Sequence, residues 1–141
     1  MDKLIDAFRN PGTWTVSVRL LILYVVSVGL FYVVDGGNRS ASEPLKEGVK
    51  NGNAASQAIV FVVAAASNAL AVLTFVFICR KMNTVPRLAM VGLPLALLLE
   101  NHVRAIRASR EHRRLELLLA AGMAIGIIGA VAALMHGSPL K

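Results

Sequence analysis

The chain has 141 residues, of which 56% are hydrophobic and only 16% are charged. Soluble domains carry about 25% charged residues and do not need long unbroken apolar runs, so the composition excludes an ordinary soluble domain. Fifteen Lys and Arg against eight Asp and Glu give a formal net charge of +7. Eight of the fifteen lie between Arg80 and Arg114, next to apolar segments. Their position indicates anionic lipid headgroups as partners and not nucleic acid.

The first apolar run, Thr15 to Val34, has twenty residues. At 1.5 Å of rise per residue, a helix of this length matches the roughly 30 Å hydrocarbon layer of a bilayer. A cleaved signal peptide has an apolar region of roughly 7–15 residues. The run is longer than that, which favours a retained transmembrane helix over residues 15–34.

Residues 35–57 form the main polar segment, rich in Gly, Asn and Ser, in which three basic and three acidic residues cancel. Gly36-Gly37 is typical of a turn. The segment is therefore predicted to be an external loop.

The second run, Ala58 to Cys79, has twenty-two residues and no charge, and it predicts a transmembrane helix over 58–79. Asn68 lies at its centre among small side chains, which let helices approach closely. An amide in this setting can form a hydrogen bond across a helix interface. Helix packing is expected at Ala65, Asn68 and Ala69.

Residues 80–116 are predicted to be a cytoplasmic basic segment that contains a short apolar stretch, 88–99. Those twelve residues include Gly92 and Pro94 and would reach only about 18 Å as a helix, so a re-entrant or interfacial position is expected. From Glu100 to Glu116, charged residues recur at helical spacing opposite a narrow apolar stripe, which predicts a basic amphipathic helix. The residues expected to contact lipid or a partner are Arg104, Arg107, Arg110, Arg113 and Arg114.

The last apolar run, Leu117 to Met135, has nineteen residues and predicts a transmembrane helix over 117–135, followed by a tail over 136–141. Small residues recur along it at helical spacing, which is a pattern of close helix packing in membranes. The residues of this seam are Gly122, Gly126, Gly129 and Ala133.

The positions of Lys and Arg choose between topologies, because cytoplasmic segments carry the excess. Three spans with the N-terminus inside place eleven basic residues inside and four outside, whereas four spans divide them seven to eight in either direction. The expected fold is therefore an all-α integral membrane protein with three transmembrane helices, a cytoplasmic N-terminus and an external C-terminus. Four transmembrane helices are the alternative. The Arg-rich, Ala-rich composition favours a bacterial inner membrane.

The sequence contains no recognisable catalytic, cofactor or metal motif, so the chain is not expected to be an enzyme. His102, His112 and His136 match no ligand spacing and are expected to face solvent or headgroups. Proton- or cation-coupled transport normally uses an acidic residue within the membrane. Asp35 and Glu116 are placed only at the edges of apolar runs, which disfavours a transporter.

We expect a small non-catalytic subunit or assembly component of a larger membrane complex, associated with other membrane subunits or with itself. One alternative follows from two or three helices combined with a basic cytoplasmic segment, an architecture that resembles the holins and implies a pore-forming lysis protein. Another follows from two apolar segments around the basic turn Arg80 to Arg87, which resemble conjugative pilins. That likeness implies a component of a secretion or conjugation apparatus.

Overall fold

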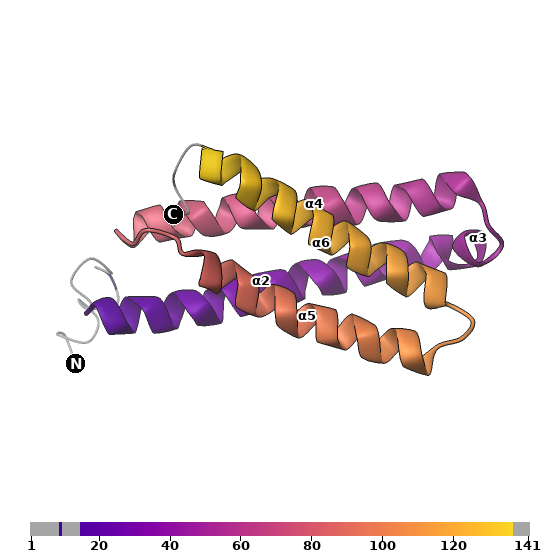
Figure 1. Ribbon diagram of the computed structural model, residues 1–141, viewed down its shortest axis with the longest axis horizontal. Coiled ribbons are helices and arrows are strands. Elements are labelled where there is room, and N and C mark those ends of the chain that lie inside the picture. The colour runs from indigo at the N-terminus through magenta and orange to yellow at the C-terminus, as the bar shows by residue number, and fades with distance from the viewer. Residues whose placement is uncertain (1–8, 10–14, 137–141) are drawn as a thin grey trace.

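The structure is a computed structural model that describes residue 9 and residues 15–136 of the chain. Four long helices lie side by side in this part of the chain: α2 (Val16–Ser42), α4 (Ala54–Lys81), α5 (Leu88–Ala108) and α6 (Arg113–His136) (Figure 1). Each is long and apolar enough to cross a membrane. The predicted all-α membrane fold is thereby confirmed, with four such helices where the preferred topology had three. The tail beyond residue 136 lies outside the described residues.

The apolar stretch 88–99 is not a short interfacial element, because it is the first half of α5. This helix has 21 residues and a length of about 31 Å, enough to span the hydrocarbon layer. Pro94 inside it cannot donate a hydrogen bond to the carbonyl of Met90, one turn earlier. The hydroxyl of Ser27 on α2 donates to that carbonyl instead. The helix therefore tolerates the proline because a neighbouring helix satisfies the freed acceptor.

The basic amphipathic helix predicted over Glu100 to Glu116 is not continuous. α5 ends at Ala108 and α6 begins at Arg113. In the connection, the backbone amide of His112 donates to the hydroxyl of Ser109 over 3.2 Å. The charged stripe is thus divided between two helices that run in opposite directions.

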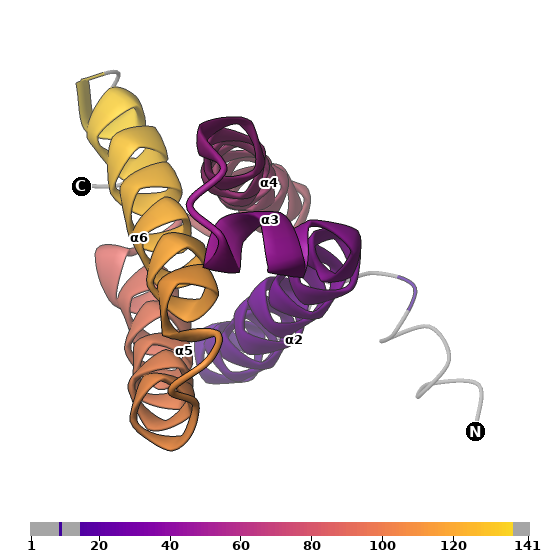
Figure 2. The ribbon, with the colours of Figure 1, turned by 90° about the vertical axis from the view of Figure 1, so that its right-hand side faces the viewer.

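The segment 35–57, predicted to be a loop, is helical over most of its length. α2 continues through Gly36-Gly37 to Ser42, and a short 3-10 turn, η2 (Glu43–Leu45), leads into α3 (Lys46–Lys50). The chain then reverses over residues 51–53, where Gly52 has a φ of 80° that favours glycine. Figure 2 shows α3 lying across this end of the bundle. We call it the loop end, and the end at which α2 begins and α6 ends the terminal end.

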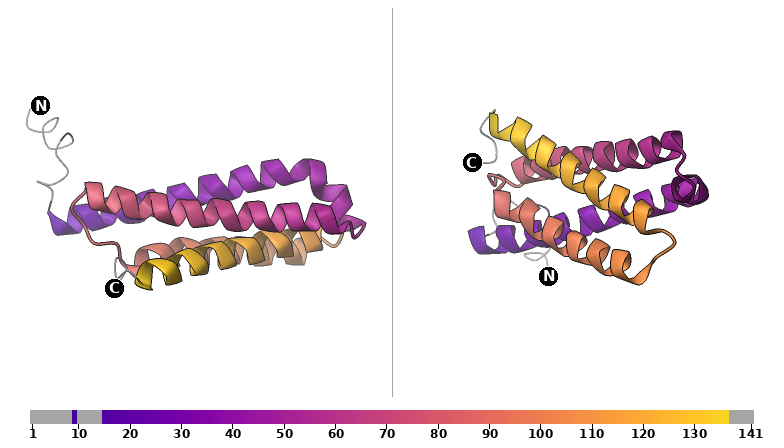
Figure 3. Two further views of the ribbon diagram at one scale, coloured as in Figure 1. Left: turned by 90° about the horizontal axis from the view of Figure 1, so that it is seen from above. Right: turned by 45° about the vertical axis from the view of Figure 1, so that its right-hand side comes forward.

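The helices form two layers, α2 with α4 and α5 with α6 (Figure 3). α6 packs most closely against α4. This contact depends on two glycines: a Cβ atom on Gly122 would come within 2.7 Å of the Ala64 side chain, and one on Gly126 within 2.9 Å of the Ala65 carbonyl carbon. Close approach of the two backbones therefore requires glycine at both positions.

The interior changes in character along the bundle. A large apolar cluster, which includes Phe31, Phe75 and Met123, fills the terminal half, and a small one around Val49 and Leu119 fills the loop end. Most of the buried polar residues, among them Asp35, Asn38, Asn68 and His102, lie between these two groups, whereas Ser27 lies within the large cluster and Ser56 lies at the loop end. A polar layer therefore separates the two apolar parts of the core.

Candidate functional site

The polar layer contains a group of four ionisable side chains that we call the buried charge cluster. They come from three helices, α2, α5 and α6, and are Asp35, Arg39, His102 and Glu116. The His102 side chain has no exposed surface, and those of Asp35 and Glu116 are each 12% exposed. Ionisable groups buried to this degree need partners, and each of the four has at least two in the cluster.

Helical phase brings these residues to the interior. Phe31 of α2, Leu98 of α5 and Leu119 of α6 all face the core. One turn further towards the loop end, the same faces carry Asp35, His102 and Glu116. The apolar stripe of each helix thus continues into the cluster at the point where the apolar runs end.

His102 lies between the two carboxylates. Its Nε2 is 3.1 Å from Asp35 Oδ1, and its Nδ1 is 3.1 Å from Glu116 Oε2. The sequence-based expectation that His102 faces solvent or headgroups is therefore wrong. It failed because the residue was placed on a surface helix, whereas α5 inserts it into the bundle.

Arg39 binds the remaining oxygens of both carboxylates. Its Nε donates to Asp35 Oδ2 over 3.1 Å, and its Nη1 donates to Glu116 Oε1 over 2.5 Å. Its Nη2 lies 3.0 Å from His102 Nδ1. The guanidinium therefore closes a ring of contacts, and its positive charge among the carboxylates does not suit a metal ion at this position.

Uncharged polar residues extend the layer from α4. The Ser67 hydroxyl donates to Asn38 Oδ1 on α2 over 3.0 Å. Asn68, which was expected to form a hydrogen bond across an interface, donates to the carbonyl of Ala64 in its own helix over 2.8 Å. Its side-chain oxygen is buried and has no hydrogen-bond partner within the described part of the chain. Ser67, and not Asn68, links the two helices.

The cluster opens towards the loop end. A hollow of about 150 Å³ reaches Arg39 and Glu116, with Ser109 and His112 in its wall. On the other side, the core is closed by buried Phe31, Leu98 and Met123. The cluster can therefore exchange protons with water at one end, while the packed apolar half opposes passage along the bundle axis.

The predicted packing residues divide into two groups. Gly122 and Gly126 lie against Ala64 and Ala65 of α4, so this part of the seam is used within the chain. Ala69 is half-buried on the same helix. Gly129 and Ala133 are exposed, and a Cβ atom on Gly129 would meet nothing within 4 Å.

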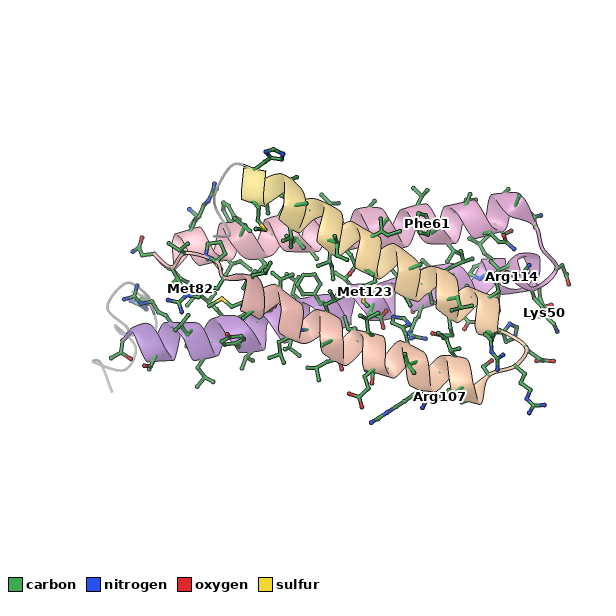
Figure 4. All side chains as sticks on the ribbon, in the orientation of Figure 1. Lys50, Phe61, Met82, Arg107, Arg114 and Met123 are labelled. Atoms are coloured by element: carbon green, nitrogen blue, oxygen red, sulfur yellow. The ribbon has the colours of Figure 1, made fainter. Side chains whose placement is uncertain are left out.

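The predicted basic residues also separate. Arg104 pairs with Glu100 over 2.6 Å on the exposed face of α5, and Figure 4 shows Arg107 pointing away from the bundle. The other three line a hollow of about 350 Å³ at the loop end. Its wall consists of Lys50, Arg110, Glu111, Arg113, Arg114 and Leu117.

Sequence reasoning missed the charge cluster, although a signal for it exists. Asp35 and Arg39 have the four-residue spacing of a helical ion pair. Asp35 follows the buried Phe31 by one helical turn, and Glu116 precedes the buried Leu119 by one turn. Treating Gly36-Gly37 as a turn ended the helical pattern too early.

The chain has no significant match among protein-family models, curated proteins or solved structures.

Proposed function

We propose that this chain is a non-catalytic multi-pass component of a larger membrane assembly, located in a bacterial inner membrane, and that α5 and α6 bind a transmembrane helix of a partner. The observation that carries the proposal is an apolar groove of about 330 Å³ between these two helices. Its walls are formed by Leu88, Val91, Gly92, Leu95, Ile127, Ile128, Val131, Ala132 and Met135.

The shape of this groove suits a helix. The ribbons of α5 and α6 diverge towards the terminal end (Figure 1), and the groove extends over about two turns of each. Gly92 and Ala132 line it with minimal side chains, and a Cβ atom on Gly92 would meet nothing within 4 Å. Small residues let a neighbouring backbone approach closely, which is how helices associate where lipid removes the hydrophobic driving force.

Photo-crosslinking in native membranes tests the groove. The only native thiol, Cys79, has no exposed surface, so a benzophenone maleimide can be attached selectively to an Ala132→Cys variant. We expect illumination to join the chain covalently to a second protein. The matched control is Leu70→Cys, because Leu70 is 62% exposed on α4, away from the groove.

Protein adducts at Ala132→Cys but not at Leu70→Cys would support helix docking, and their mass would distinguish a second copy from another protein. Adducts with lipid alone at Ala132→Cys would contradict the proposal. So would equal protein adducts at both positions.

We further propose that the basic hollow at the loop end binds the headgroup of an anionic phospholipid. Figure 4 shows Arg114 and Lys50 at this end. Lys50 pairs with Glu111 over 3.6 Å. The three arginines of the lining therefore leave it with a net positive charge. Leu117, 50% exposed, provides an apolar wall beside these charges, which matches a headgroup joined to acyl chains.

Lipid retention tests this second contact. The double variant Arg110→Gln, Arg114→Gln should retain less phosphatidylglycerol after purification, since each basic residue near an anionic surface contributes about 1 kcal/mol. The double variant Arg80→Gln, Arg87→Gln removes the same charge at the opposite end. Native mass spectrometry of both proteins from mixed phosphatidylglycerol and phosphatidylcholine nanodiscs gives the comparison. Equal losses would indicate general charge attraction and contradict a specific site.

A pore of the holin kind is less well supported for a single copy of the chain. Large apolar side chains fill the terminal half of the core, and the polar layer ends against them. A conduction path would have to form between copies instead.

A further inference from the structure

The hydrogen-bond geometry of the buried charge cluster defines a proton-binding site, which is independent of the docking function proposed above. An ionised carboxylate can only accept hydrogen bonds. His102 Nε2 faces Asp35 Oδ1 at 3.1 Å, so this nitrogen carries a hydrogen and donates it. The tautomer of the ring is thereby assigned at one nitrogen.

The other ring nitrogen has two neighbours of opposite kind. Glu116 Oε2 is an acceptor 3.1 Å from Nδ1, and Arg39 Nη2 is a donor 3.0 Å from the same atom. With a proton on Nδ1, the ring donates to Glu116. Without it, Nδ1 accepts from Arg39. Both forms of the imidazole therefore keep a hydrogen bond at each ring nitrogen, so neither form leaves a ring nitrogen buried without a partner.

The charge count agrees with one exchangeable proton. With a protonated His102, two positive and two negative groups balance; a single proton on Glu116 in place of His102 gives the same net charge. The charged groups that face the ring are Asp35 and Arg39 from α2 and Glu116 from α6. α4 carries no charged residue between positions 58 and 79. Glu43, Lys46 and His112 line the hollow that leads outwards.

We propose that His102 and Glu116 hold one exchangeable proton, which enters and leaves only through the polar hollow at the loop end. The hollow reaches Glu116 and Arg39 directly. The opposite side is closed by the apolar cluster. Binding from one side only suits a sensor of pH in the compartment that the loop end faces, and not a transporter within one bundle.

Nitrogen NMR of the full chain in detergent micelles, with ¹⁵N-labelled histidine, tests the proton assignment. Signals are assigned with His112→Gln and His136→Gln. As the pH changes, we expect the Nε2 signal of His102 to remain that of a protonated nitrogen while only the Nδ1 signal moves. Movement of both signals together, as in a free imidazole that exchanges tautomers, would overturn the proposal.

Saturation transfer from water to the His102 Nδ1 hydrogen tests the entry route. A Ser109→Cys variant is compared before and after attachment of a benzyl thiol reagent, which fills the hollow while the buried Cys79 stays unmodified. We expect at least a tenfold loss of transfer. The same reagent on Gly92→Cys, in the apolar groove, should leave transfer unchanged. An unchanged signal after modification of Ser109→Cys, or equal losses in both variants, would overturn the one-sided route.

Discussion

Among the acidic, basic and histidine residues that the structure describes, His102 is the most deeply buried. It has no exposed surface, and both of its ring nitrogens lie 3.1 Å from a carboxylate oxygen. A buried ionic group is not by itself a source of stability, because its desolvation offsets the attraction between charges. Its removal is costly for another reason: the partners remain buried without compensation.

Glu116→Gln should therefore destabilise the bundle by about 3–5 kcal/mol, the range for breaking a buried ion pair. The matched control is Glu100→Gln, which makes the same chemical change in a pair whose side chains are 57% and 73% exposed. Exposed pairs contribute about 0.2–1 kcal/mol. Thermal unfolding in detergent gives both values, and similar effects for the two variants would contradict a structural dependence on the cluster.

At the scale of elements, the contact between α4 and α6 depends on glycines of the small-residue seam that the sequence predicts. The spacing of this seam does not show which of its glycines pack against another helix of the same chain. Gly126 lies against the backbone of Ala65, whereas Gly129, three residues later, faces outwards. One helical turn therefore separates a packing glycine from one on the outer surface.

Gly126→Ala should weaken the contact between α4 and α6 by about 1–3 kcal/mol, because the added methyl group overpacks a filled interface. Gly129→Ala should be neutral or stabilising by up to about 1 kcal/mol, since alanine is the better helix former and its position is open. Unfolding midpoints of the two variants provide the measurement. A loss at Gly129→Ala as large as that at Gly126→Ala would place a further contact on the outer face.

The C-terminal end of α2 lies further along the chain than the hydrophobic pattern of the sequence predicts. Hydropathy ended the first helix at Val34, but Asp35, Asn38 and Ser42 are buried at the same helical phase. A polar residue on a core-facing stripe resembles a loop residue in composition and differs only in its partners. Asp35 has its distant partner, His102, on α5, and Asn38 has Ser67 on α4, so local sequence cannot reveal them.

At the scale of the molecule, the arrangement places both described ends of the bundle together. α2 begins and α6 ends at the terminal end (Figure 1), whereas the three-span topology predicted termini on opposite sides. The count of basic residues in the sequence does not choose a direction, because with Arg39 set aside a four-span topology assigns seven Lys and Arg to each side. Sidedness therefore needs a measurement.

Topology reporters attached before Met1, after Lys141 and within the reversal at Asn51 test this arrangement. If the four helices cross the bilayer as one bundle, the first two reporters should lie on the same side and the third on the other. Termini on opposite sides would contradict four spans and favour the three-span topology. The expectation follows from helix direction alone and does not depend on the charge cluster.

The sequence by itself determined that this is a membrane protein and where most of its helices lie, because long uncharged runs are stable only where lipid surrounds them. It also indicated glycines suited to close packing. Only the tertiary structure decided that residues 88–108 form a fourth full-length helix and that Asp35, Arg39, His102 and Glu116 meet. The physical reason is that a buried charge is stable only with its counter-charges, and here the paired residues lie up to 77 positions apart in the sequence.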